Sequence, residues 1–352
     1  MAQARRLWDL DLLTLGQAAD QVRRRLHPES RVTFVIDRNI NYTNVCVSGC
    51  RFCAFYRPPG APEGYVLDWE GLAEKLGELK AFGGSGVLLQ GGLNPDLPLD
   101  YYEKLVGFIR GFGLGVHGFS PPEIFFLSRQ TGLSLQEIIR RLMTAGLSSI
   151  PGGGAEILVD RVRRRVSPNK CTSAQWLKVM ETAHGEGLKT SATMMFGHLE
   201  TREERVEHLI KIRELQEKTG GFTAFIPWTY QPGGTDLKGE ALGAVEYLRT
   251  LAVSRLVLDN VPHLQVSWVT QGPKVAQVAL KFGADDFGST MLEENVVAAT
   301  GVGFRLSREE IDTLIRQSGY EPQVRDHRYR ILTHQDIKGI KDSPQIHREP
   351  RA

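Results

Sequence analysis

Apolar and polar positions follow two different periods along this chain. A β-branched run at 32–37 predicts a strand. It leads into a segment where Asn39, Asn41 and Thr43 alternate with apolar residues, which is also the period of a strand. These polar side chains would point into a site or fill a polar lumen. Seven further short apolar runs follow, each after a segment with helical spacing. The predicted strands lie at 38–46, 84–92, 114–123, 148–158, 189–197, 222–230, 263–270 and 284–290. The predicted helices lie at 1–28, 68–81, 100–110, 134–144, 173–184, 201–218, 245–258, 273–282 and 308–317.

Strands that alternate with helices imply parallel pairing with right-handed crossovers. Eight such units predict an α/β fold, a (β/α)8 barrel of the TIM type. Glycine, proline and polar residues gather just after the strands, at the rim that carries the active site in such barrels. We expect an N-terminal helical segment at 1–31, the barrel at 32–306 and a C-terminal extension with one or two helices at 307–352. The residues from Lys341 onward look loosely ordered.

Three of the four cysteines stand close together, at Cys46, Cys50 and Cys53. Such close thiolates either bridge or hold one metal centre, and a sulfur-rich site selects zinc, copper(I) or an iron–sulfur cluster. A zinc site usually shows a second cysteine or histidine pair, whereas Cys171 stands alone, and a disulfide would leave one thiol over. Three thiolates without a fourth ligand leave one position open, which is typical of a reactive site.

Composition and charge limit the classes of function. The 352 residues are 41% hydrophobic and 24% charged, which is ordinary for a globular protein with a large core. The formal net charge of +2 gives no footprint for nucleic acid. The first residues lack the apolar core of a signal peptide, and no apolar run is long enough to span a membrane. Free, clustered cysteines fit a reducing compartment, so we expect a cytoplasmic protein.

The C-x3-C-x2-C spacing, with Phe52 before the last cysteine, resembles the signature of the radical S-adenosylmethionine (radical SAM) enzymes. This resemblance implies that Cys46, Cys50 and Cys53 hold three irons of a 4Fe–4S cluster. The fourth iron would bind the amino and carboxylate groups of S-adenosylmethionine (SAM).

Longer strings narrow the resemblance to the radical SAM enzymes of the futalosine route to menaquinone. They are DRNINYTNVCVSGCRFCAFYR, HGFSPPE, IPGGGAEIL, SATMMFGHLET and SWVTQGPKVAQVALKFGADDFGST. The likeness is strongest to the enzymes that cyclise dehypoxanthine futalosine. It implies that a 5′-deoxyadenosyl radical takes hydrogen from the ribose of this substrate, and that the carbon radical closes a ring onto the benzoate. An electron donor such as a flavodoxin or a ferredoxin would reduce the cluster.

Other functions stay open from the sequence. Aminofutalosine synthase and the deazaflavin-cofactor (FO) synthase components share the CxxxCxFCAF core. A member of another class, a non-catalytic metal-binding or electron-carrier protein, would not need the glycine-rich rim. The resemblance favours the cyclase.

Several rim residues are candidates for binding SAM. Gln90, Gly91 and Gly92 resemble the glycine-rich motif whose backbone receives the amino group of SAM, although a simple strand-ending turn would look the same. Glu156 follows a triple glycine and could bind ribose hydroxyls, or only favour a helix N-terminus. The remaining predicted cofactor-binding residues are Phe52, Ser120, Arg161 and Met194. Met194 could form an apolar wall for adenine. Arg161 or Arg163 could pair with a carboxylate or lie on the surface.

Candidates for proton transfer and substrate contact come from the same rim. His198 is a candidate by residue type, although a lone histidine is more often structural. Glu123 and Asp286, at the third and eighth predicted strands, complete the predicted catalytic set. The wider pool on the substrate side adds His117, Trp268 and Gln271.

Overall fold

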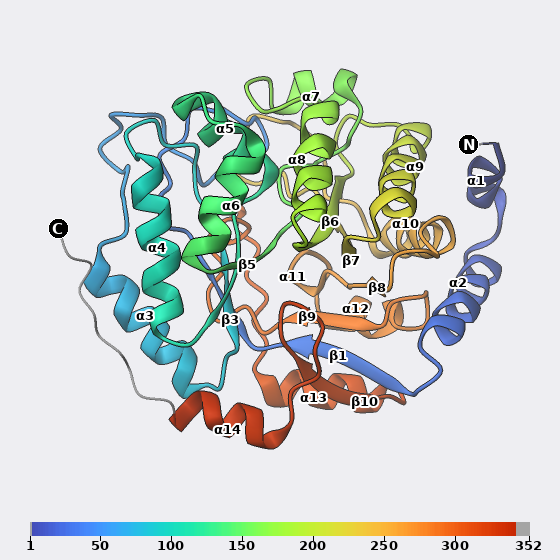
Figure 1. The fold of residues 1–352 in the computed structure, drawn as a ribbon. Coiled ribbons are helices and arrows are strands. Elements are labelled where there is room, and N and C mark those ends of the chain that lie inside the picture. Colours follow the sequence, from blue (N-terminus) through green and yellow to red (C-terminus); the bar gives the residue numbers. More distant parts are fainter. Residues whose placement is uncertain (1, 343–352) are drawn as a thin grey trace.

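The computed structural model describes residues 2–342, and its main sheet consists of parallel strands that curl around a central space (Figure 1). Within these residues the strand order of this sheet is β2-β3-β4-β5-β6-β7-β8. The strands are β2 Asp37–Ile40, β3 Gly86–Leu89, β4 Gly115–Gly118, β5 Leu147–Ile150, β6 Lys189–Phe196, β7 Phe222–Thr229 and β8 His263–Leu264. This sequential order confirms the predicted parallel α/β barrel topology.

A second sheet completes the circle of strands. It has the order β10-β1-β9, with β10 Glu321–Arg325, β1 Arg31–Val35 and β9 Asp286–Ser289. β1 leads directly into β2, so a single stretch of chain borders both sheets. A parallel bridge between Gln265 and Asp286 links the continuation of β8 to β9. Each predicted strand therefore has its counterpart, and together they form a TIM-like barrel.

Helices cover the outside of the strands (Figure 1). The prediction of a helix after nearly every strand is confirmed, whereas α5 and α7 were not predicted. Capping boxes mark the starts of α5, α6, α8, α9 and α13. The helices are α1 Ala2–Arg6, η1 Leu7–Asp9, α2 Leu12–Leu26, α3 Trp69–Ala81, α4 Leu99–Gly111, α5 Pro121–Thr131, α6 Leu135–Ala145, α7 Asp160–Val166, α8 Ser173–Gly185, α9 Arg202–Thr219, α10 Ala244–Val257, α11 Trp268–Gln271, α12 Pro273–Ala279, η2 Ala298–Thr300, α13 Arg308–Gln317 and α14 His334–Asp342.

The predicted seventh strand, 263–270, is too long. The backbone N–H of Val266 still donates to Asp286 O at 3.0 Å, but that of Ser267 donates to the hydroxyl of Tyr247 at 2.7 Å. The indole N–H of Trp268 donates to Ser289 O at 3.0 Å. The strand ladder therefore ends before Trp268, where α11 begins.

The C-terminal segment contributes a strand, β10, as well as the helices α13 and α14, where one or two helices were predicted. β10 has the sequence EPQVR, and a proline in such a polar run argues against a strand when only the sequence is known. It pairs with β1, so the residues after it reach the lower end of the barrel (Figure 1). None of the described helices is long and apolar enough to cross a bilayer. The three-part division of the chain stays a prediction, and residues 343–352 lie outside the described residues.

Candidate active site

The three clustered cysteines lie on the loop between β2 and α3. Cys46 and Cys50 are buried and Cys53 is half-buried, and all are free thiols. The hydroxyl of Ser48 lies 2.9 Å from Cys46 Sγ and 3.3 Å from Cys50 Sγ, and so brings these sulfurs together. The backbone N–H of Leu93, after β3, donates to Cys46 Sγ at 3.2 Å. Ser48 thus holds the sulfurs of Cys46 and Cys50 near each other on this loop.

Glycines let the loop after β3 approach the cysteines. A Cβ at Gly92 would lie 2.1 Å from Val45 O and 2.9 Å from Cys46 Cβ. A Cβ at Gly91 would lie 2.4 Å from the ring of Tyr42. Only glycine fits where the backbones come this close.

Replacing Gly92 with alanine therefore has a predictable effect on the cluster site. The new methyl group would push Val45 and Cys46 out of place, so Gly92→Ala should bind less iron after anaerobic reconstitution. Gly107→Ala is the control, because nothing lies within 4 Å of a Cβ there. Equal iron contents in the two variants would contradict this role of Gly92.

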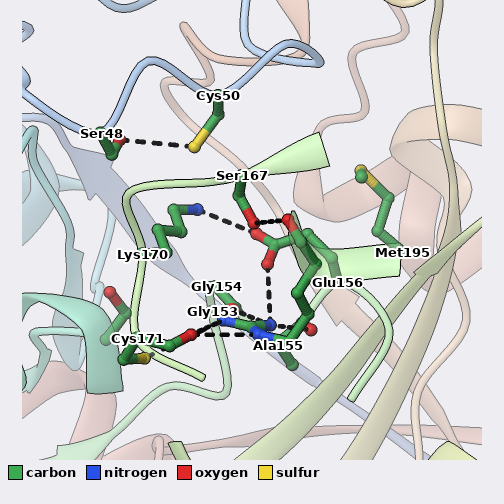
Figure 2. Close-up of polar contacts among 12 residues, drawn as sticks. Ser48, Cys50, Gly153, Gly154, Ala155, Glu156, Ser167, Lys170, Cys171 and Met195 are labelled. Atoms are coloured by element: carbon green, nitrogen blue, oxygen red, sulfur yellow. Dashed lines mark hydrogen bonds and ion pairs between the residues drawn. The ribbon is translucent and has the colours of Figure 1, made fainter. Parts of the chain in front are cut away.

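Glu156 forms a buried charge cluster, which lies below Cys50 in Figure 2. It follows Gly152–Gly154 and has a positive φ of 42°. Its carboxylate accepts from Lys170 Nζ at 2.9 Å and from Arg163 Nη1 at 3.1 Å. Lys170 Nζ also lies 5.0 Å from the ring centroid of Phe52, between the second and third cysteines. The cluster thus links the rim after β5 to the cysteine loop.

The charges of this cluster stabilise one another. Burial would raise the pKa of Glu156, but Lys170 and Arg163 outweigh it and hold the pKa below its ordinary value. Burial would lower the pKa of Lys170, but Cys50 and Glu156 outweigh it and raise that pKa. Burial raises the pKa of Cys50 to about 11 and also raises that of Cys53. Metal binding must therefore displace protons from these thiols.

Glu123 and Ser120 lie together at the start of α5. The Glu123 carboxylate accepts from the Ser120 hydroxyl at 2.6 Å, from Tyr42 Oη at 2.7 Å and from the Gly91 N–H at 3.1 Å. Burial raises the pKa of Glu123 against these hydrogen bonds. Its partners make it a support for the Gln90–Gly92 turn, and its predicted catalytic role has no direct evidence.

Arg161, His198 and Met194 do not hydrogen-bond to the Glu156 carboxylate. Burial lowers the pKa of His198, and the nearby Glu200 and Glu156 oppose that shift, so His198 lies near the Glu156 cluster. Arg161 is half-exposed and pairs with Glu204 at 2.6 Å, so Arg163 is the arginine that holds Glu156. Both ring nitrogens of His198 contact the backbone: Nε2 lies 3.0 Å from Met195 O, and Nδ1 accepts from the Leu199 N–H at 2.7 Å. Ser191 and Thr193 of β6 line the lumen, so strand alternation places Met194 on the outer side.

Asp286 lies deep in the barrel rather than at the rim. Arg325 of β10 donates to its two oxygens, from Nε at 2.5 Å and from Nη2 at 2.8 Å. Both side chains are buried. This geometry is that of a buried ion pair, and the catalytic role of Asp286 stays a prediction.

Lys170 and Arg325 were not predicted, because single cations outside any motif give no signal in the sequence.

A cavity of about 270 Å³ lies inside the barrel, below the predicted SAM residues. Gln90, Gly153 and Glu156 border it at the rim, and Arg325 and His327 border it at the floor. Two of the predicted cofactor-binding residues, Gln90 and Glu156, and the substrate candidate His117 therefore border the same cavity.

Two family models cover most of the chain. Residues 40–212 match the Radical SAM superfamily, and residues 219–337 match the CofH/MqnC C-terminal region. With a parallel barrel and a three-cysteine loop after β2, the chain belongs to the radical SAM superfamily of enzymes.

Relatives that match over most of their length place the chain in a smaller group within this superfamily. Over 94% of its length the chain is 46% identical to "Cyclic dehypoxanthine futalosine synthase" of Halalkalibacterium halodurans, covering 91% of that protein. It is 44% identical to the protein of the same name from Streptomyces coelicolor over 93% of this chain and 84% of that protein. It is 37% identical, over 89% of this chain and 92% of that protein, to "5-amino-6-(D-ribitylamino)uracil--L-tyrosine 4-hydroxyphenyl transferase" of Archaeoglobus fulgidus. The likeness predicted from the motif strings is confirmed.

Solved structures confirm the fold. The chain superposes on methylornithine synthase (PylB) with a TM-score of 0.71 at 18% identity, covering 96% of this chain and 95% of that one. It matches the [FeFe]-hydrogenase maturase HydG with the same score at 16% identity, over 91% of this chain and 72% of that one.

Membership of the superfamily implies a 4Fe–4S cluster and SAM as cofactors, and the residues at the rim fit them. Among the described residues, the compact group suited to a single metal ion is His27, His263 and Asp285 rather than the cysteines. The three cysteines share one short loop as free thiols, and thiolates are the ligands by which proteins hold iron–sulfur clusters. Lys170 and Glu156 offer a cation and an anion, beside the cysteines, for the charged end of SAM.

Proposed function

We propose that this chain cyclises dehypoxanthine futalosine in menaquinone biosynthesis. The observation that carries the proposal is the identity of 44–46% to two proteins named for this reaction, each matched over nearly the whole chain. The relatives named as 4-hydroxyphenyl transferases reach 35–38%. The cysteine loop and the cavity inside the barrel also fit such a reaction.

The protein's own part in this reaction is to bind, to orient and to exclude water. A 4Fe–4S cluster bound with SAM supplies hydrogen-atom abstraction by a 5′-deoxyadenosyl radical. Cys46, Cys50 and Cys53 would hold the cluster, while Lys170 and Glu156 would fix SAM by its charged groups. The barrel wall would hold the substrate carbon about 3–3.5 Å from the reacting atom and keep solvent away.

The proposal includes a reducing environment. An electron donor such as a flavodoxin or a ferredoxin would deliver the electron to the cluster. Three free thiols at the rim call for a reducing compartment, so we infer that the protein works in the cytoplasm.

An anaerobic assay with reduced protein, SAM and dehypoxanthine futalosine tests the function. We expect 5′-deoxyadenosine and, in equal amount, a product lighter by two hydrogen atoms in its mass spectrum. No 5′-deoxyadenosine from this substrate would contradict the cyclase.

A second candidate is the transferase activity named for the archaeal relatives. The identity of 37% to the Archaeoglobus fulgidus protein over 89% of this chain favours it as an alternative. The same protein incubated with tyrosine and 5-amino-6-(D-ribitylamino)uracil should give no coupled product if the cyclase is correct, and a coupled product would favour the transferase.

A further inference from the structure

The cavity inside the barrel has two chemically different walls. Side chains from β2, β4 and β6 make one wall polar, whereas β7 and the segment after β8 place large apolar side chains on the other, beside Thr223, Gln265, Ser267 and Thr270. The polar wall includes Asp37, Asn39, His117 and Thr193. The apolar wall includes Ile226, Trp228, Val266 and Trp268. A ligand that fills this space must itself have a polar and an apolar end.

The polar wall carries no uncompensated positive charge among the described residues that line it. Its cation, Arg325, is already paired with Asp286 through two hydrogen bonds. Burial lowers the pKa of His327 to about 3 and also that of His117, so both imidazoles are neutral. A phosphate or another polyanion would find no free cation here, so the wall suits uncharged polar groups.

Asn39 offers this wall an unfilled acceptor. Its side chain is 4% exposed and lines the cavity, and its Oδ1 has no hydrogen-bond partner among the described residues. An unpaired buried acceptor is costly, and a ligand hydroxyl that donates to it would remove that cost.

Asp37 lies two residues away on the same face of β2, with one oxygen accepting from the Ser289 hydroxyl. Its other oxygen lies 3.4 Å from His327 Nε2. Burial raises the pKa of Asp37 to about 7, so near neutral pH the carboxyl is partly protonated and can either donate or accept.

The apolar wall offers flat aromatic surface to the same ligand. Trp228 lies two residues after Ile226 on β7, so both side chains face the cavity. Trp268 is fixed by the hydrogen bond of its indole to Ser289 O at 3.0 Å. Aromatic rings such as those of Trp228 and Trp268 favour packing against an aryl group.

We propose that this cavity binds a molecule that joins a hydroxylated sugar to an aromatic ring, with the sugar on Asn39 and Asp37 and the ring on Trp228. The proposal deepens the function proposed above, because dehypoxanthine futalosine carries both a ribose and a benzoate. Asn39 pairs in register with Leu88, and Gln90 follows on the same face of β3. The sugar therefore lies next to the predicted SAM residues, where hydrogen abstraction takes place.

Calorimetric titration of the cluster-loaded protein, with SAM but without reductant, tests the sugar end. Asn39→Ala should bind dehypoxanthine futalosine about tenfold more weakly than the unchanged protein. Among analogues that each lack one ribose hydroxyl, one should bind equally well to both proteins, because its missing group is the partner of Asn39. Asn260→Ala is the matched control, since its Oδ1 is also buried without a partner but lies outside the cavity lining.

A second pair of variants tests the aromatic end, and it keeps the proposal testable if Asn39→Ala does not fold. Trp228→Ala should weaken binding about tenfold, and Trp228→Phe should restore most of it. Unchanged affinity in both Asn39→Ala and Trp228→Ala, while the unchanged protein still cyclises the substrate, would overturn this inference alone. An unchanged protein that does not bind dehypoxanthine futalosine at all would overturn the proposed function as well.

Discussion

Cys50→Ser should contain no iron–sulfur cluster and have no activity. Cys50 Sγ lies within 3.3 Å of the Ser48 hydroxyl that also contacts Cys46, and a serine hydroxyl is a poor substitute for a thiolate as an iron ligand. Iron and sulfide analysis after anaerobic reconstitution should therefore fall to background. Formation of 5′-deoxyadenosine should disappear with it.

Cys171→Ser is the matched control for this experiment. Cys171 is equally buried, and burial raises its pKa to about 11, so it matches Cys50 in both respects. Its contact is with Arg163, whose guanidinium donates to the backbone carbonyl of Cys171 at 2.6 Å, a bond that serine keeps. The variant should retain its iron. Equal loss of iron in both variants, or a full cluster in Cys50→Ser, would refute the ligand assignment.

Arg325→Met should lower the free energy of unfolding by about 3–5 kcal/mol, because it leaves Asp286 charged, buried and unpaired. Neither side chain of this pair is more than 3% exposed, and the Thr33 hydroxyl also donates to Asp286. Urea denaturation followed by circular dichroism measures the change. A loss below about 1 kcal/mol would show that the pair does not support the barrel floor.

Two comparisons sharpen this result. Arg316→Met removes a pair with Glu321 whose side chains are 57% and 65% exposed, so it should cost no more than about 1 kcal/mol. Adding Asp286→Asn to Arg325→Met should recover part of the lost stability, because the unpaired charge is then gone. A folded Asp286→Asn variant without activity would instead support the catalytic role predicted from the sequence.

The barrel was predictable because its signals are local. Short β-branched runs separated by amphipathic segments identify strands and helices, and the strand order follows from their sequence. The errors came where a side chain from elsewhere ends a strand, as the Tyr247 hydroxyl does at Ser267. β10 was missed because pairing with β1, and not its own composition, makes it a strand.

The candidate site was predictable only where its chemistry is concentrated in a motif. The cysteine spacing and the glycine pairs identified the cluster loop and the turn beside it. By contrast, Arg161 or Arg163 was predicted to pair with a carboxylate or to lie on the surface. Only the fold shows that Arg163 pairs with Glu156 while Arg161 reaches Glu204. Lys170 reaches the cysteines from a loop more than a hundred residues away, which no local pattern records.

The central claim is that three thiolates hold a 4Fe–4S cluster whose fourth iron is open to SAM. Electron paramagnetic resonance of the reduced, reconstituted protein tests it most directly when spectra are recorded with and without SAM. We predict a 4Fe–4S signal whose g values change when SAM is added, because SAM binds the open iron. A protein that takes up zinc but no iron, or a cluster signal that SAM leaves unchanged, would contradict the account.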